Sequence, residues 1–334
     1  MTNPETKVVR FHETGGASVL QIDSVPLAEP GTGEVRLRVE ALGLNRAEVM
    51  FREGQYLEAP TLPSRLGYEA AGVVDAVGAE VEGVAVGDRV STIPAFSMGT
   101  HGVYGESAIV PATAVASYPE ALTAAQGTSI WMQYLTAFGA LIEHGKLSSG
   151  QTVLITAASS SVGIAAIQIA KSVGATAIAT TRGAAKKQGL LDAGADHVVV
   201  TDDEDLAEAV SALTDGNGAQ LVFDPIGGPG LEALANATAS GGTIFEYGAL
   251  STEPTPYPLF AALGKGLSIR GYTLFEISGN PERLARGKSF VYEGLASGAL
   301  SPQLAERRFT LAEIAEAHRY MEANTHTGKI VVTV

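Results

Sequence analysis

The middle of the chain repeats one pattern, in which a short continuous apolar run is followed by a segment of helical periodicity and then by another apolar run. Residues 155–182 show it most clearly, with an apolar run, a turn of small residues, an amphipathic segment and a second apolar run. Strands that are apolar on both faces and alternate with helices are typical of βαβ units with right-handed crossovers. This region therefore predicts a doubly wound parallel sheet.

The segments before and after this region show different sequence patterns. Residues 8–120 consist of short β-branched runs broken by glycine and proline, which is typical of an all-β barrel or sandwich. Helical periodicity starts near residue 121 and continues to 144, and residues 267–275 read as one further strand. The end of the chain holds an amphipathic helix and a short strand, which we expect to fold back onto the all-β domain. The predicted division is 1–122 with 296–334 for the all-β domain and 123–295 for the parallel-sheet domain.

Composition excludes several classes of function. The formal net charge of −14 over 334 residues includes no basic cluster, which argues against nucleic-acid binding. The absence of cysteine rules out disulfides and any zinc site built on thiolates. No apolar run is long enough to predict a membrane span, and the N-terminal residues lack the pattern of a secretion signal, so we expect a cytoplasmic protein.

The turn in residues 155–182 falls where a dinucleotide-binding fingerprint is expected. The three glycine positions of G-x-G-x-x-G correspond to Ala158, Ser160 and Gly163, so only the third is glycine. The start of the following helix offers N–H groups and a positive dipole end to a phosphate. We interpret Ser160, Ser161, Val162 and Gly163 as pyrophosphate contacts. The alternative is that the serines only form the turn and cap the helix.

The second apolar run of this region ends in Thr181 and Arg182, where NAD-binding sites carry an acidic residue for the ribose 2′-OH. The first acid after it is Asp192, whereas Lys186 and Lys187 follow closely. Hydroxyl groups and cations bind a 2′-phosphate that a carboxylate would repel. The predicted cofactor is therefore NADPH, bound through Thr181, Arg182 and Lys186. Alternatively, one or both lysines belong to a solvated helix face.

Four stretches carry a resemblance to a known superfamily. They are LGLNRAEVMFREGQY (residues 42–56), LPSRLGYEAAGVVDAVGAEVEGVAVGDRV (62–90), AASSSVG (157–163) and HTGKIVVTV (326–334). On these the chain resembles the medium-chain dehydrogenase/reductases over nearly its full length, and among them the zinc-independent quinone oxidoreductases. The resemblance implies an α/β protein with an N-terminal GroES-like all-β domain and a Rossmann domain. It also implies a homodimer that pairs through an edge strand near residues 268–275.

The resemblance assigns roles to individual residues. It implies that Asn45 lies beside the nicotinamide or the substrate and that Tyr56 points into the cleft, where it could donate a proton. The alternative for Tyr56 is a rim residue that only packs. Relatives often carry a second tyrosine six residues before it, where this chain has Met50. The other implied cofactor neighbours are Thr136, Asp224, Tyr247, Gly248, Leu274, Phe275 and Lys329.

Zinc alcohol dehydrogenases, the more distant relatives, hold their catalytic metal with cysteine and with the histidine of a G-H-E motif. This chain reads Gly67-Tyr68-Glu69 at that motif, and its six histidines are scattered. We therefore expect no metal site, and we interpret Glu69 as a structural anchor rather than a base.

The expected reaction follows from the cofactor and the missing metal. Without a Lewis acid, oxidation of a simple alcohol is poorly supported. Hydride transfer from NADPH to a quinone or an α,β-unsaturated carbonyl is the prediction, with Tyr56 as hydrogen-bond or proton donor and Asn45 as orienting group. The alternatives are an NADPH-binding sensor with little turnover and, less favoured, an alcohol dehydrogenase.

Overall fold

The computed structural model describes residues 4–334, so the first three residues of the predicted all-β domain lie outside the described residues. The chain forms two compact units. The first contains the chain up to Met132 together with Pro302–Val334, and the second is Gln133–Ser301.

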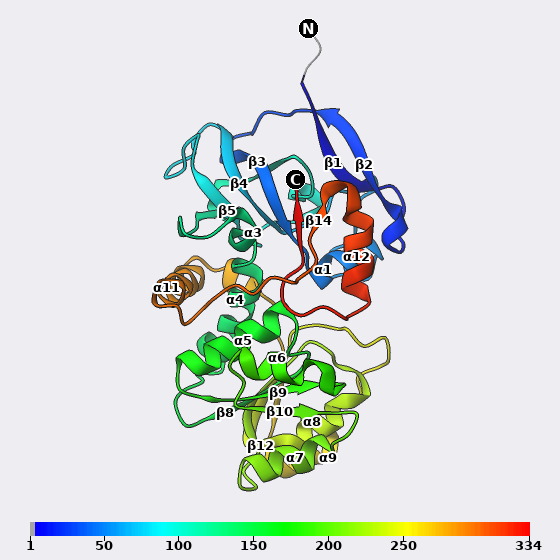
Figure 1. Ribbon diagram of the computed structural model, residues 1–334, viewed down its shortest axis with the longest axis vertical. Coiled ribbons are helices and arrows are strands. Elements are labelled where there is room, and N and C mark those ends of the chain that lie inside the picture. Colours follow the sequence, from blue (N-terminus) through cyan, green and yellow to red (C-terminus); the bar gives the residue numbers. More distant parts are fainter. Residues whose placement is uncertain (1–3) are drawn as a thin grey trace. The chain divides into compact units, whose positions relative to one another are not determined.

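The first unit is built mainly on antiparallel strands, and β14 and β15 pair in parallel (Figure 1). A two-stranded ribbon pairs β1 with β2, and a seven-stranded sheet has the order β14-β15-β3-β4-β5-β7, with β6 also paired to β3. Strand β15 pairs antiparallel with β3, so the end of the chain returns to this unit. The strands are β1 (Glu5–Phe11), β2 (Leu20–Pro26), β3 (Glu34–Gly43), β4 (Glu69–Val77), β5 (Arg89–Thr92), β6 (Ser107–Pro111), β7 (Val115–Ser117), β14 (Phe309–Thr310) and β15 (Val331–Thr333).

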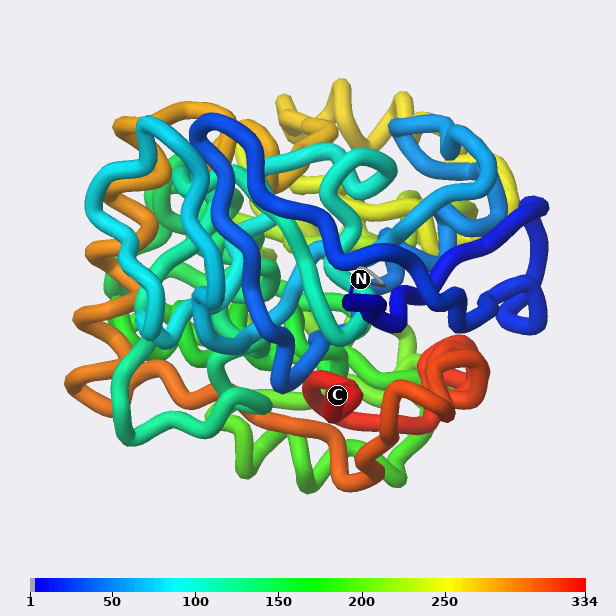
Figure 2. The backbone as a smooth tube through the Cα atoms, turned by 90° about the horizontal axis from the view of Figure 1, so that it is seen from above, coloured from blue at the N-terminus to red at the C-terminus, as the bar shows by residue number. Residues whose placement is uncertain are grey.

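Short helices fill the connections of the first unit. Helix α12 packs beside the 3₁₀ turn η1, as Figures 1 and 2 both show, which brings the C-terminal segment next to the N-terminal ribbon. The helices are η1 (Ala17–Val19), α1 (Arg46–Arg52), α2 (Met98–His101), η2 (Ala112–Ala114), α3 (Ala124–Gly127), η6 (Leu311–Glu313) and α12 (Ile314–Glu322).

The second unit is a six-stranded parallel sheet with the order β10-β9-β8-β11-β12-β13. In order of sequence this is 3-2-1-4-5-6, the arrangement of the dinucleotide-binding fold, and the strand order reverses between β8 and β11. Strand β13 lies at the edge of the sheet. The strands are β8 (Thr152–Ile155), β9 (Thr176–Thr181), β10 (His197–Val200), β11 (Ala219–Asp224), β12 (Thr238–Glu246) and β13 (Ser268–Gly271). The prediction of a doubly wound parallel sheet is confirmed.

Helices cover both faces of this sheet: α5 and α6 lie on one face, and α7, α8 and α9 lie on the other (Figure 1). A core of fully buried aliphatic side chains from β8, β9, β11 and β12 packs against α7 and α8. The helices are α4 (Trp131–Phe138, which starts in the first unit), the π-helix η3 (Gly139–His144), α5 (Ser161–Ser172), η4 (Ala184–Lys186), α6 (Lys187–Asp192), α7 (Leu206–Leu213), η5 (Gly228–Gly230), α8 (Leu231–Ala237), α9 (Leu259–Lys265), α10 (Phe275–Ser278) and α11 (Pro281–Ser297).

The structure corrects three local predictions. The helix predicted over 121–144 is broken, because Thr123 caps the short α3 and the chain starts again at α4. The strand predicted over 267–275 ends at Gly271, after which the chain turns into α10. Helix α1 lies within a region interpreted as strands only. Contacts of α3 with β3 and β4 place Ala124–Gly127 in the first unit.

Among residues 4–334, no helix is both long and apolar enough to cross a membrane. In the same range, no group of three histidine or acidic side chains lies close enough together to hold a metal ion.

The central position of β8 gives a test of the second unit. Leu154 is fully buried in the core, so its replacement by alanine should lower the free energy of unfolding by about 3 kcal/mol through lost burial and a residual cavity. Leu213, at the end of α7, is 38% exposed, and Leu213→Ala should change the free energy of unfolding by less than about 0.5 kcal/mol. Urea denaturation followed by far-UV circular dichroism measures both. Equal losses would contradict this assignment of the core.

Candidate active site

The turn between β8 and α5 is shaped by the close packing of a helix on a strand. Ala157 has a positive φ of 44°, and Ala158 is fully buried. A Cβ on Gly163 would lie 2.5 Å from the Ala158 Cα, which no side chain can tolerate. Gly163 therefore plays the part of the third glycine of the dinucleotide fingerprint, the one that lets the helix approach the strand.

Ser160 is the N-cap of α5, and its Oγ accepts the N–H of Gly163 at 3.1 Å. The capping interpretation of this serine is thus confirmed, while its contact with a phosphate stays a prediction. The N–H groups of Ser161 and Val162 head the helix, where no preceding turn supplies a carbonyl. Together with the helix dipole, they form a favourable environment for an anion.

The cations predicted to bind a 2′-phosphate follow the end of β9. Thr181 Oγ1 donates to the Gly183 carbonyl at 3.2 Å, and Arg182 is exposed. Lys186 Nζ donates to Ser159 Oγ at 3.1 Å, so this lysine lies against the turn although it is 27 residues further along the chain. Burial lowers the pKa of Lys186, and the charge of Arg182 lowers it further, which indicates that the two cations lie near each other. Lys187 is exposed and starts α6.

Asp224 ties the ends of three neighbouring strands together at the point where the strand order reverses. It is fully buried and accepts hydrogen bonds from the Thr156 hydroxyl and, at 2.7 Å, from the Gly227 N–H. Its carbonyl accepts the N–H of Tyr247 at 2.9 Å. A Cβ on Gly248 would lie 2.6 Å from the Pro225 carbonyl oxygen, so glycine is needed where these two loops meet.

A second acid accompanies Asp224. Glu246 lies opposite it in the register of β11 and β12, and burial together with the neighbouring Asp224 raises the pKa of Glu246 to about 8. The next residue, Tyr247, stacks on Phe223 with ring centroids 3.9 Å apart. Burial, then the charge of Asp224, raises the pKa of Tyr247, and the side chain of Ser160 lies close to its hydroxyl. This end of the sheet therefore brings an acid pair and a tyrosine near the serine turn.

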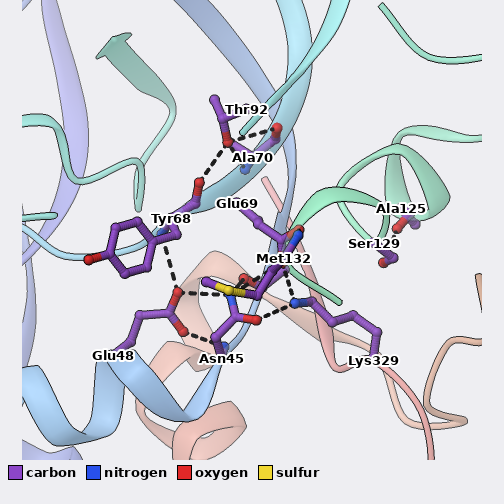
Figure 3. A network of polar contacts seen from close by, with 11 residues as sticks. Asn45, Glu48, Tyr68, Glu69, Ala70, Thr92, Ala125, Ser129, Met132 and Lys329 are labelled. Carbon is purple, nitrogen blue, oxygen red and sulfur yellow. Dashed lines mark hydrogen bonds and ion pairs between the residues drawn. The ribbon is translucent and has the colours of Figure 1, made fainter. Parts of the chain in front are cut away.

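The first unit contains a buried polar network, drawn in Figure 3. Lys329 Nζ forms an ion pair with Glu69 and donates to Asn45 Oδ1 at 2.5 Å. Asn45 Nδ2 donates in turn to Glu69 Oε2 at 3.2 Å. A Cβ on Gly43 would lie 2.7 Å from the Lys329 Cε, so the missing side chain at this position makes room for the lysine. Glu69 Oε1 also accepts the N–H of Met132 at 2.8 Å.

Glu48 extends this network without any exposure to solvent. Its carboxylate accepts the N–H of Asn45, the Asn45 Nδ2 at 3.1 Å and the Tyr68 N–H at 3.2 Å. Burial raises the pKa of Glu48 to about 7, against the opposing effect of Lys329 and these hydrogen bonds. Burial therefore favours the protonated form of this carboxyl group more than water would. Asn45 has partners within the unit for both of its amide atoms, so its implied part in orienting a substrate stays a prediction.

Tyr56 belongs to a chain of aromatic rings beside this network. Its ring centroid lies 6.5 Å from that of Phe51 and 6.5 Å from that of Tyr68. Tyr68 is fully buried and also contacts Phe96 at 5.8 Å. Burial raises the pKa of Tyr56, while a side-chain hydrogen bond with Tyr68 lowers it. Tyr56 is thus partly buried, and its hydroxyl lies next to that of Tyr68.

The remaining implied residues lie in the second unit. Thr136 is nearly buried within α4, Leu274 is nearly buried before α10, and Phe275 is the partly exposed first residue of that helix. Their contacts with a cofactor stay predictions. Sequence reasoning missed Glu48, Thr156 and Glu246 as members of polar clusters. Each becomes recognisable only when strands and helices distant in the sequence pack together.

Comparison with known proteins agrees with this architecture. The family model described as Alcohol dehydrogenase GroES-like domain matches residues 31–120, and the one described as Zinc-binding dehydrogenase matches residues 161–287. The second match contains no cysteine and one histidine, His197. The quinone oxidoreductase of Pseudomonas aeruginosa is 33% identical over 327 residues, which cover 98% of this chain and 99% of the relative.

Two solved structures are similar over the full length. Escherichia coli quinone oxidoreductase complexed with NADPH has a TM-score of 0.90 at 28% identity, covering 98% of this chain and all of the other. An NAD-dependent alcohol dehydrogenase has the same TM-score at 33% identity, covering 98% and 99%. The domain matches, the relative and the strand order all agree, so the chain belongs to the medium-chain dehydrogenase/reductase superfamily, in its quinone oxidoreductase branch.

Proposed function

We propose that this protein is an oxidoreductase that uses NADPH to reduce a quinone or an α,β-unsaturated carbonyl compound, without zinc. The observation that carries the proposal is the contact of Lys186 with Ser159, which joins a cation after β9 to the dinucleotide turn. The quinone oxidoreductase relatives, one of them solved with NADPH, support the same class of reaction.

The residues of the second unit fit a dinucleotide phosphate. Gly163 allows the close approach of α5 to the strand, and the N–H groups of Ser161 and Val162 offer hydrogen bonds to the pyrophosphate. Arg182 and Lys186 would hold the 2′-phosphate, because no acid follows β9 before Asp192. When bound, NADPH supplies the hydride, and the protein contributes binding, orientation and electrostatics.

The first unit supplies the proton chemistry in this proposal. Reduction of a quinone or enone leaves negative charge on an oxygen, which a hydrogen-bond donor stabilises and a proton neutralises. Tyr56 carries a hydroxyl of raised pKa, so it keeps its proton at neutral pH and can donate it. The network of Asn45, Glu69 and Lys329 fixes the start of α1, the helix that precedes Tyr56.

Two alternatives differ from this proposal, one in substrate and one in turnover. The similarity to an NAD-dependent alcohol dehydrogenase raises an alcohol as substrate and NADH as product. The chain has Tyr68 where the G-H-E motif carries histidine, and it has no cysteine, so the ligands of a catalytic zinc are missing. A regulatory NADPH-binding protein would share the cofactor site but would turn over slowly.

An activity assay decides among these possibilities. The purified protein should oxidise NADPH in the presence of 1,4-benzoquinone, 9,10-phenanthrenequinone or a short enone, with no loss of rate after dialysis against EDTA. The decrease in absorbance at 340 nm measures turnover. Loss of activity on chelation and its recovery with zinc would contradict the metal-free proposal. Tight NADPH binding without turnover on any acceptor would favour the regulatory alternative.

Cofactor preference is tested at Lys186, for which the adjacent lysine is a matched control. Lys186→Ala removes a charge-assisted contact, so the Kd for NADPH should rise about tenfold while the Kd for NADH is unchanged. Lys187→Ala, at an exposed position, should change neither value by more than about twofold. Fluorescence titrations at fixed ionic strength measure these constants. Equal losses for the two cofactors in Lys186→Ala would argue against 2′-phosphate recognition.

The acid pair predicts a pH dependence of cofactor binding. Glu246, with its pKa near 8, is protonated below that pH and adds a second negative charge beside Asp224 above it. The affinity for the anionic NADPH should therefore fall about fivefold between pH 7 and pH 9, since roughly 1 kcal/mol of repulsion is added. Glu246→Gln should remove this dependence, and Glu253→Gln, on the exposed loop nearby, should retain it. A flat wild-type profile would contradict the assignment.

A further inference from the structure

Tyr68 is held in one position by its backbone as well as by its ring. Its N–H donates to Glu48 Oε1 at 3.2 Å, and its carbonyl accepts the Thr92 hydroxyl at 2.8 Å. The ring is about 1% exposed and packs against Phe96. Because both its backbone and its ring are held, Tyr68 keeps its hydroxyl in one direction. Binding of a substrate then requires no further ordering of this side chain.

The neighbour of that hydroxyl is Tyr56. The two rings lie 6.5 Å apart at an angle of 59°, and their side chains are joined by a hydrogen bond. The hydrogen bond with Tyr68 lowers the pKa of Tyr56. Once Tyr56 has lost its proton, its oxygen can only accept a hydrogen bond, so in that state Tyr68 is the donor. Tyr56 is only partly buried, so it is the member of the pair with a surface open to a ligand.

We propose that Tyr68 is a positioning residue for proton delivery: its hydroxyl donates to the oxygen of Tyr56, holds that oxygen in place and stabilises it after Tyr56 has released a proton to the reduced acceptor. The proposal rests on the proposed function. The proton leaves the Tyr56 O–H bond and forms an O–H or C–H bond on the acceptor, which the hydride from NADPH has reduced. NADPH is oxidised in the same turnover, and water returns a proton to Tyr56.

The surroundings of Tyr56 raise its pKa, and the hydroxyl of Tyr68 counteracts this effect. Two acids, Glu48 and Glu58, act on Tyr56, and each raises its pKa, as does burial. The hydrogen bond with Tyr68 is what lowers the pKa of Tyr56. Without it, Tyr56 holds its proton more tightly and becomes a weaker acid, although the ring contacts around it persist.

The test removes one hydroxyl and keeps the ring. In Tyr68→Phe, kcat should fall about tenfold, with an increased solvent deuterium isotope effect, while KM for the acceptor and the Kd for NADPH stay within twofold. In a second preparation, 3-fluorotyrosine is placed at position 56 and its ionisation is followed by ¹⁹F NMR. The midpoint of that titration should rise by about one pH unit when Tyr68 becomes phenylalanine, equivalent to a tenfold loss of acidity.

Tyr118→Phe is the matched control, because Tyr118 is a buried tyrosine of the first unit whose hydroxyl accepts from Arg89. It should leave kcat and the ¹⁹F midpoint unchanged. Tyr56→Phe should reduce kcat at least as much as Tyr68→Phe, and the double variant should lose no more than Tyr56→Phe alone.

The outcomes separate this proposal from the proposed function. An unchanged ¹⁹F midpoint in Tyr68→Phe overturns the hydrogen-bond assignment whatever the activity. A raised midpoint with unchanged kcat and isotope effect overturns the role in proton delivery. If the wild-type protein reduces no acceptor, the proposed function fails, while the titration still decides whether Tyr68 tunes Tyr56.

Discussion

The first unit depends on one buried ion pair. The ammonium group of Lys329 and the carboxylate of Glu69 are both almost wholly removed from water, which is costly unless each finds its partner and further hydrogen bonds. Asn45 supplies those bonds from the start of α1. Because Lys329 stands two residues before β15, the pair joins the last strand to β4 and to α1. Loss of either charge would leave the other buried and unpaired.

The second unit also buries a charged group, but without an ion pair. The carboxylate of Asp224 is fully buried where the strand order reverses, and it is satisfied by a hydroxyl and an N–H rather than by a cation. Thr156 donates that hydroxyl from the end of β8, next to the serine turn. The geometry of the turn therefore depends on a contact across two strands, and the steric limit at Gly163 then fixes the approach of the helix.

The sequence predicted the parallel sheet well because its signal is local: each apolar run and each helical segment is legible within a dozen residues. It failed where local patterns were short or mixed. Helix α1 is seven residues long among strands, and Gly271 separates a strand from a helix inside one apolar run. The polar network was beyond such reasoning, because Asn45 and Lys329 meet across 284 positions. Lys186 was identified from spacing, but its contact with Ser159 required the fold.

The position of Tyr68 shows how one place in a scaffold can serve different chemistry. In the G-H-E motif a histidine stands there as a metal ligand, whereas here a tyrosine follows Gly67 and precedes the buried Glu69. In this chain, backbone hydrogen bonds to Glu48 and Thr92 hold Tyr68 at that position. A hydroxyl at this point cannot polarise an oxygen as a metal ion does, but it can donate a hydrogen bond. With Met50 in the place of the second tyrosine that relatives often carry, Tyr68 brings a second phenol to Tyr56 from a different element.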